Sequence, residues 1–127
     1  MAKKAWNLEA AVYSALRRAH RNSPEYRDAL NAVKGEFYIY SKKGKKLRRV
    51  HFSCRICNGT KSRKEVFVDH IHPVIDPRVG KAGFASYINR LFCGVGGLQI
   101  LCRKCHQLKT QAENAIRRRT KKEKANG

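Results

Sequence analysis

The chain has 127 residues, of which 29 are Lys or Arg and 9 are Asp or Glu, so its formal net charge is +20. This length suits one modest domain and excludes two independent cores, and the positive charge predicts a polyanionic partner, although a basic surface that is merely well solvated is the plainer alternative. Because the sequence contains no long apolar run, signal segment or lipidation pattern, we expect that partner to be nucleic acid and not a membrane.

Two helices are predicted near the start of the chain. Residues 7–21 place apolar side chains at helical spacing behind Asn7, which is available as an N-cap. A second helix is expected to begin after Ser23, another capping residue, and to stop at Gly35. We therefore expect a helical leader over residues 1–35.

A basic β-hairpin is predicted next, over residues 36–53. Residues 37–40 and 47–52 are rich in strand-forming side chains and flank a Lys-Gly turn. The turn carries several lysines, so the tip of this hairpin is expected to attract phosphate groups.

The rest of the chain alternates short apolar runs with loops. Residues 65–74 favour a strand that ends at a proline, 84–94 a short helix, and 97–102 a short apolar strand or turn. Helix-forming residues dominate 103–119, and the basic stretch 120–127 is predicted to be a disordered tail.

Two C-x2-C pairs, "CRIC" and "CRKC", stand far apart in the sequence. Five cysteines without a secretory signal indicate a reducing, cytoplasmic compartment and metal binding in preference to disulfides. The pairs predict one tetrahedral structural zinc site in a treble-clef layout, and the plainer alternative is a set of free thiols in a core. Cys93 has no partner at ligand spacing and is expected to be a small buried hydrophobe. The predicted zinc ligands are Cys54, Cys57, Cys102 and Cys105.

A second site is predicted beside the zinc. His106 directly follows Cys105, and neighbours on a helix are rotated by about 100°, so His106 must point away from the zinc. If the Asp69-His70 strand packs on this helix, a carboxylate and an imidazole define an open cation site.

The stretches "CRIC", "VDHIHPV" and "GLQILCRKCHQLKT" resemble the HNH endonucleases of the ββα-metal fold, in the zinc-knuckle form common in phage and prophage proteins. The resemblance covers residues 54–110. It implies an α+β fold with a zinc-knuckle core over residues 54–119, in the cytoplasm of a phage-infected or prophage-carrying bacterial host. The resemblance also implies that Asp69 and His106 would hold a catalytic Mg²⁺, Mn²⁺ or Ni²⁺ and that His70 would be the general base.

One position departs from the family's pattern, because Gly97 stands where the middle asparagine is expected. Either His70 is then held less firmly and activity is weakened or lost, or Asn89 or Gln99 braces it instead. His72 is expected to share a strand face with His70, either supporting the site or as a partly exposed strand residue. His20 and His51 have no site context in the sequence.

The leading hypothesis is a metal-dependent endonuclease that nicks or cuts DNA with little sequence specificity, acting as a monomer. One alternative is a zinc-stabilised DNA-binding module in which Asp69 and His106 merely pair, and another is a DNA-packaging accessory that works with a phage terminase. The residues expected to contact DNA phosphates are exposed cations of the hairpin tip and the last helix: Lys42, Lys43, Lys45, Lys46, Arg103, Lys104, Arg117, Arg118 and Arg119.

Overall fold

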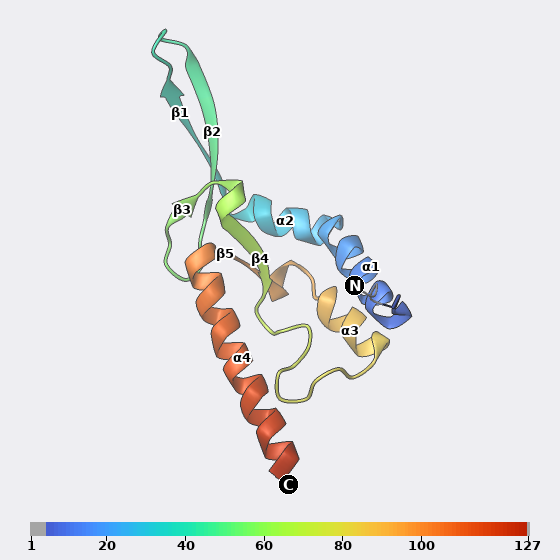
Figure 1. The fold of residues 1–127 in the computed structure, drawn as a ribbon. Helices are drawn as coiled ribbons and strands as arrows, with labels where there is room; N and C mark the ends of the chain where they lie inside the picture. The colour runs from blue at the N-terminus through green and yellow to red at the C-terminus, as the bar shows by residue number, and fades with distance from the viewer. Residues whose placement is uncertain (1–4, 127) are drawn as a thin grey trace.

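The computed structural model describes residues 5–126 of the chain. It begins with two consecutive helices, α1 (Leu8–Arg21) and α2 (Pro24–Ala32) (Figure 1). The Asn7 side chain accepts a hydrogen bond from the Ala10 amide at 3.0 Å, and the Ser23 side chain accepts one from the Tyr26 amide at 3.4 Å. Both predicted caps are therefore confirmed, since each satisfies an amide that the first turn of a helix leaves free.

Gly35 does not end α2, which stops at Ala32. The chain turns at Val33 and enters strand β1 (Lys34–Tyr40) directly, so Gly35 lies within a strand. It is paired with His51, whose imidazole ring occupies the space that a Cβ at residue 35 would need. Glycine is used here for a close approach between neighbouring strands, not for a helix stop.

The predicted hairpin is present and longer than expected. Strand β1 pairs antiparallel with β2 (Lys46–Ser53), and the register runs from Lys34 opposite Phe52 to Tyr40 opposite Lys46. The short strand β3 (Thr60–Lys61) joins only the base of β2. As a result the distal part of the hairpin projects away from the body of the molecule (Figure 1).

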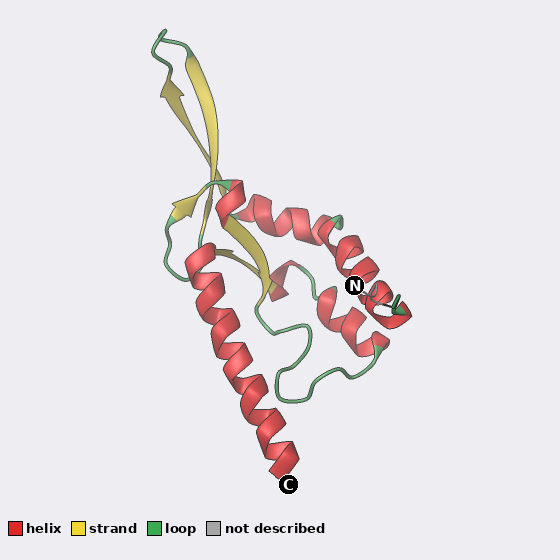
Figure 2. Cartoon of the chain, viewed as in Figure 1, coloured by secondary structure: helices red, strands yellow, loops and turns green. Residues whose placement is uncertain are grey.

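The second sheet contains β4 (Val66–His70) and β5 (Leu98–Cys102), which pair antiparallel with Asp69 opposite Gln99. The single turns of 3-10 helix η1 (Arg63–Glu65) and η2 (Val95–Gly97) lead into these strands, and α3 (Phe84–Leu91) lies between them in the chain. Strand β4 thus ends before the predicted proline, and residues 97–102 contain a strand and not merely a turn. Helices and small antiparallel sheets together confirm the α+β class (Figure 2).

The last helix, α4 (Arg103–Asn126), corrects the prediction of a disordered tail over residues 120–127. The stretch from residue 120 to residue 126 contains Lys, Glu and Ala, which favour helix, and has neither Gly nor Pro. The helix therefore continues past Arg119 to the end of the described residues, and Gly127 lies outside them.

Three small apolar clusters hold the body together. One packs α2 on the two sheets through Ala29, Phe52, Val66, Leu98 and Ile100, and a second packs α1 on α3 through Tyr13, Tyr87 and Leu91. The third consists of Leu101 and three of the predicted zinc ligands. No helix within residues 5–126 is long and apolar enough to cross a membrane. Small apolar clusters leave much of the stability to other interactions, and metal binding is one of those that small folds use.

Candidate functional site

The four predicted cysteines come together in one cluster, with their sulfur atoms all within 4.8 Å of one another. Cys54 follows β2, and the turn after it is closed by the Asn58 amide, which donates to the Cys54 carbonyl at 2.9 Å. Asn58 has φ +59°, the left-handed conformation that this turn requires and that asparagine tolerates. Cys102 ends β5 and Cys105 lies in the first turn of α4. The prediction of a four-cysteine site is confirmed.

The dimensions and chemistry of this cluster fit zinc. The sulfur atoms of Cys57 and Cys102 are 3.8 Å apart, and the edge of a tetrahedron with Zn–S bonds of about 2.3 Å is about 3.8 Å. Burial opposes ionisation of Cys54, but the amides of Cys57, Cys102 and Ile56 outweigh it and lower its pKa to about 6. Burial and the neighbouring sulfur atoms raise the pKa of Cys105 to about 12. The pKa values of Cys54 and Cys105 are thus shifted in opposite directions. A divalent cation would allow both thiols to ionise, because its charge compensates several thiolates at once.

Asp69 faces α4, where the predicted histidine lies. The His106 ring is stacked on Phe67, with centroids 4.7 Å apart, and its Nε2 is 3.9 Å from Asp69 Oδ1. Gln99, opposite Asp69 in the sheet, donates to Asp69 Oδ2 at 2.8 Å. The structure thus brings Asp69 and His106 together from separate elements, as expected. Their role as cation ligands stays a prediction, since within residues 5–126 the cysteine cluster is the one group of three or more suitable ligands.

An ammonium group already lies against Asp69. Lys109 Nζ is 3.1 Å from Asp69 Oδ2, donates to the His70 carbonyl at 3.0 Å and contacts the Glu113 carboxylate. Burial opposes the charged form of Lys109, but the carboxylates of Glu113 and Asp69 raise its pKa above the usual value. Neither Lys109 nor Glu113 was predicted from the sequence to be part of the site. Helical spacing was the available signal, since Lys109 and Glu113 follow His106 at successive turns of one helix face.

His70 faces the opposite side of β4, toward the leader helices. Its Nε2 is 2.8 Å from the Leu91 carbonyl oxygen, and burial lowers its pKa below the ordinary value of a histidine. Its ring centroid is 5.0 Å from that of His20, a buried residue whose Nε2 is 3.1 Å from Glu25 Oε2. Neither His20 nor Glu25 was predicted to lie at this site, because only the packing of α1 and α2 on β4 brings them near His70.

His70 also lines a cavity of about 380 Å³ that contains two arginines of α1. Arg17 and Arg21 are one turn apart and exposed, and Arg17 donates to the Tyr87 hydroxyl at 3.4 Å. Tyr26 of α2 lines the same cavity. Such a combination of arginines beside a histidine suits a phosphate group.

The two residues predicted to brace His70 do something else. Gln99 holds Asp69, as described above, and Asn89 is exposed on α3. Bracing comes from the backbone, because the Leu91 carbonyl contacts His70 and the Gly97 carbonyl accepts from the Ile71 amide at 2.9 Å. An asparagine side chain at residue 97 is therefore not needed to hold the end of β4 against the start of β5.

Two further expectations were wrong. His72 shares no strand face with His70, because β4 ends at His70, and it lines a different cavity together with Lys109 and Glu113. Cys93 is exposed, not buried, because it follows α3 at the surface of the molecule.

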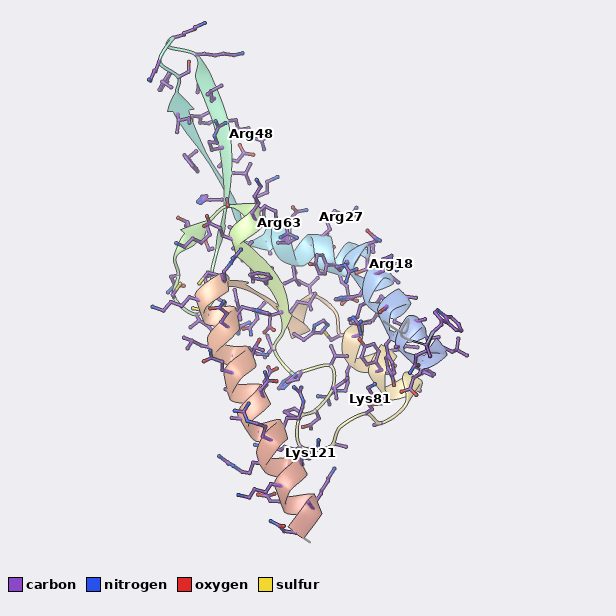
Figure 3. The ribbon with its side chains drawn as sticks, in the orientation of Figure 1. Arg18, Arg27, Arg48, Arg63, Lys81 and Lys121 are labelled. Carbon is purple, nitrogen blue, oxygen red and sulfur yellow. The ribbon has the colours of Figure 1, made fainter. Side chains whose placement is uncertain are left out.

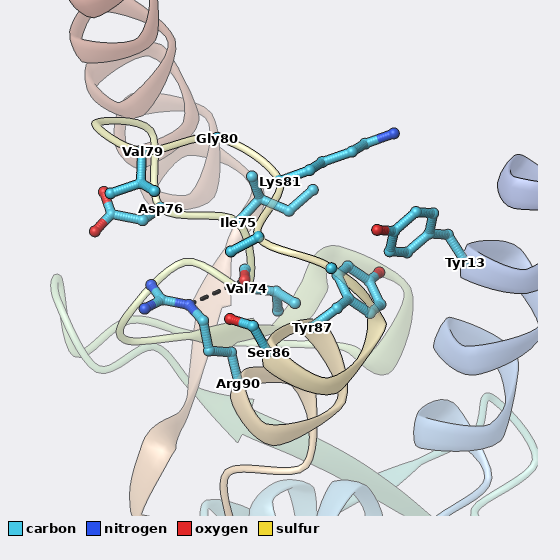
Figure 4. Close-up of a pocket in the computed structure, with 12 residues that line it drawn as sticks. Tyr13, Val74, Ile75, Asp76, Val79, Gly80, Lys81, Ser86, Tyr87 and Arg90 are labelled. Atoms are coloured by element: carbon cyan, nitrogen blue, oxygen red, sulfur yellow. Dashed lines mark hydrogen bonds between the residues drawn. The ribbon is translucent and has the colours of Figure 1, made fainter.

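The loop from β4 to α3 borders the candidate site and is fastened to α3 by one side chain. Arg90 donates through Nε to the carbonyl oxygens of Pro73 and Val74, each at 3.0 Å. Figure 4 shows the contact of Arg90 with Val74 beside a smaller cavity of about 90 Å³ that Tyr13 and Tyr87 also line. The loop therefore has a fixed start next to His70.

The residues predicted to contact DNA are exposed and widely distributed. The hairpin lysines surround the turn between β1 and β2, while Arg103 and Lys104 begin α4 and residues 117–119 lie farther along it. Figure 3 shows that other basic residues, among them Arg18, Arg27 and Lys121, extend this distribution over α1, α2 and α4. Their contact with DNA stays a prediction.

Comparison with known proteins adds no further assignment: no family model, curated protein or solved structure matches this chain. The likeness to HNH endonucleases therefore rests on the quoted motifs, and the structure adds the four-cysteine cluster that could hold zinc.

Proposed function

We propose that this zinc-stabilised protein is a metal-dependent DNA endonuclease with His70 as its general base. The observation that carries the proposal is the contact between His70 Nε2 and the Leu91 carbonyl. A carbonyl oxygen only accepts, so Nε2 carries the proton of the neutral ring and Nδ1 is left free to accept one from water. Burial favours this neutral form, and Arg17 and Arg21 of the same cavity are placed to bind the phosphate.

Asp69 and His106 would hold the catalytic cation, which neutralises charge on the phosphoryl oxygens when bound. Asp69 and His70 lie on opposite sides of β4, and the strand ends at His70, so the phosphodiester would have to lie across this end to reach both side chains. Lys109 would then have to move away from Asp69, because its ammonium group, 3.1 Å from Asp69 Oδ2, repels a cation bound to the same carboxylate.

Supercoiled plasmid tests this proposal. The zinc-loaded protein should nick or linearise it when Mg²⁺, Mn²⁺ or Ni²⁺ is added and leave it intact without them. His70→Ala should lower the cleavage rate by about 10² to 10⁴ with little change in DNA affinity, because it removes only the proton acceptor. His51→Ala, which alters a histidine of the hairpin, is the control. A parent protein that never cuts, or a His70→Ala variant that cuts as fast as the parent, contradicts the assignment.

A second candidate is a zinc-stabilised DNA-binding module without catalysis. The contact of Lys109 with both Asp69 and Glu113 favours it, because an ammonium group that stays in place excludes a metal ion. Titration of zinc-loaded protein with Mn²⁺ separates the two candidates. For the nuclease, the parent binds Mn²⁺, Asp69→Ala weakens binding and Lys109→Met strengthens it, with Lys104→Met on the same helix as the control. For the module, neither the parent nor Lys109→Met binds Mn²⁺.

A further inference from the structure

One face of the projecting hairpin alternates aromatic and cationic side chains. In the antiparallel register Tyr38 is opposite Arg48 and Tyr40 is opposite Lys46, and residues directly opposite one another share a face of the ribbon. We call these residues, Tyr38, Tyr40, Lys46 and Arg48, the tyrosine face. Tyr38 is 52% exposed and Tyr40 is 70% exposed, which is unusual for side chains of this size.

The other face of the same hairpin has a different character. Phe37, Ile39 and Leu47 lie there, and Phe37 packs edge-on against His51, with ring centroids 5.8 Å apart. Phe37 and Ile39 are also partly exposed, at 46% and 39%. Arg49 is opposite Phe37 on this face, but Ile39 is opposite Leu47, so the face has one ring beside one cation and no second pair of that kind. It therefore provides an internal comparison.

The side chains of the tyrosine face are exposed, and they also contact one another and their neighbours. Lys46 Nζ lies 4.3 Å from the centroid of the Tyr38 ring, and Arg48 pairs with Glu36 on the same face. Tyr38 and Tyr40 are two residues apart on a strand, which separates them by about 7 Å along the ribbon. Each ring therefore has room for its own flat ligand, next to a cation.

We propose that the tyrosine face binds an unpaired nucleic-acid strand, so that the substrate of this protein has a single-stranded segment beside duplex. Aromatic rings stack on the flat faces of bases, and in a duplex those faces are covered by neighbouring base pairs. Lys46 and Arg48, with the lysines of the tip, supply the positive charge that the phosphates of such a strand require. The inference deepens the proposed action on DNA, and it does not depend on cleavage.

The test measures binding with no divalent cation added, so that cleavage plays no part. The probes are fluorescein-labelled oligo(dT), a blunt duplex of the same length, and vesicles containing phosphatidylserine. The double variant Tyr38→Ala/Tyr40→Ala should lose about 10- to 100-fold in affinity for oligo(dT) and keep its affinity for duplex. Tyr38→Phe/Tyr40→Phe should bind like the parent, because it keeps the rings.

Phe37→Ala/Ile39→Ala is the matched control on the opposite face, and zinc content and circular dichroism check that each variant is folded. The inference is overturned if the parent does not bind oligo(dT), if the alanine variants of both faces lose the same affinity, or if the tyrosine variant loses duplex and oligo(dT) binding equally. Loss of vesicle binding alone would assign the face to an anionic membrane instead. If the parent never cuts plasmid but the Tyr38→Ala/Tyr40→Ala variant loses affinity for oligo(dT) as expected, the nuclease proposal is refuted and this inference stands.

Discussion

Beside the candidate site, Cys93 occupies the space that a side chain at residue 97 would need. A Cβ built on residue 97 would lie 2.5 Å from Cys93 Sγ and 2.8 Å from Cys93 Cβ. An asparagine at this position, which the resemblance to HNH endonucleases implies, would therefore displace Cys93. The Gly97 carbonyl still accepts a hydrogen bond from the Ile71 amide, so the end of β4 is held against the start of β5 without an amide side chain.

We predict that Gly97→Ala lowers the free energy of unfolding by about 1–3 kcal/mol, because the added methyl group overpacks this contact. Gly96→Ala is the control, since a Cβ there meets no atom within 4 Å. Adding Cys93→Gly to Gly97→Ala should recover most of the loss. Urea unfolding of zinc-loaded protein measures all of these values. Equal effects of the two alanine substitutions would show that steric contact with Cys93 is not the cause.

Sequence predicted the residues of the site where spacing along one element was sufficient. The two C-x2-C pairs predicted the zinc ligands, and the rotation from Cys105 to His106 on one helix predicted that His106 points away from them. His20 and Glu25 were not predictable, because their position near His70 depends on how α1 and α2 pack on the sheet. Lys109 was missed for a different reason: its spacing was visible, but a lysine in a basic chain gives no sign of a partly buried carboxylate partner.

At the scale of elements, the cysteine cluster joins the first sheet to the second sheet and to the last helix. It links the end of β2, the end of β5 and the start of α4, and Leu101 is the apolar residue buried with it. The sequence predicted these elements, but the extents of β1, β2 and α4 were underestimated. Helix α4 continues because nothing in residues 120–126 stops it, and the strands extend because each lengthens the other's hydrogen-bond ladder.

Removing zinc, or replacing Cys102 by serine, is expected to unfold the part of the chain from β4 to α4. Structural zinc contributes on the order of 10 kcal/mol to folding, more than the small apolar clusters of this protein can replace. Elemental analysis should find one zinc per chain in the parent and none in Cys102→Ser. Cys93→Ser, outside the cluster, should keep the metal and the parent's melting behaviour. A Cys102→Ser protein that melts like the parent would contradict the structural role of the metal.

At the scale of the whole molecule, the net charge of +20 is spread over several elements. Basic residues stand on α1, α2, the hairpin and α4, as Figure 3 shows for Arg18, Arg27, Arg48 and Lys121. Composition alone predicted a polyanionic partner, but it could not tell that some of these cations line the cavity at His70 and others the tyrosine face. That division depends on the packing of α1 and on the register of β1 with β2.

Binding to duplex DNA should therefore be strong, weakly dependent on sequence and steeply dependent on salt. If about six to ten phosphates are neutralised, affinity falls by about 10³ to 10⁵ between roughly 50 and 200 mM salt, because each contact releases condensed counterions. Replacing one hairpin lysine, as in Lys43→Gln, should reduce the slope of log affinity against log salt by about 1 without changing sequence preference. Fluorescence anisotropy on two unrelated duplexes at several salt concentrations measures both effects. A shallow slope with a sharp preference between the duplexes would mean that base contacts dominate and that the basic surface is not the main source of affinity.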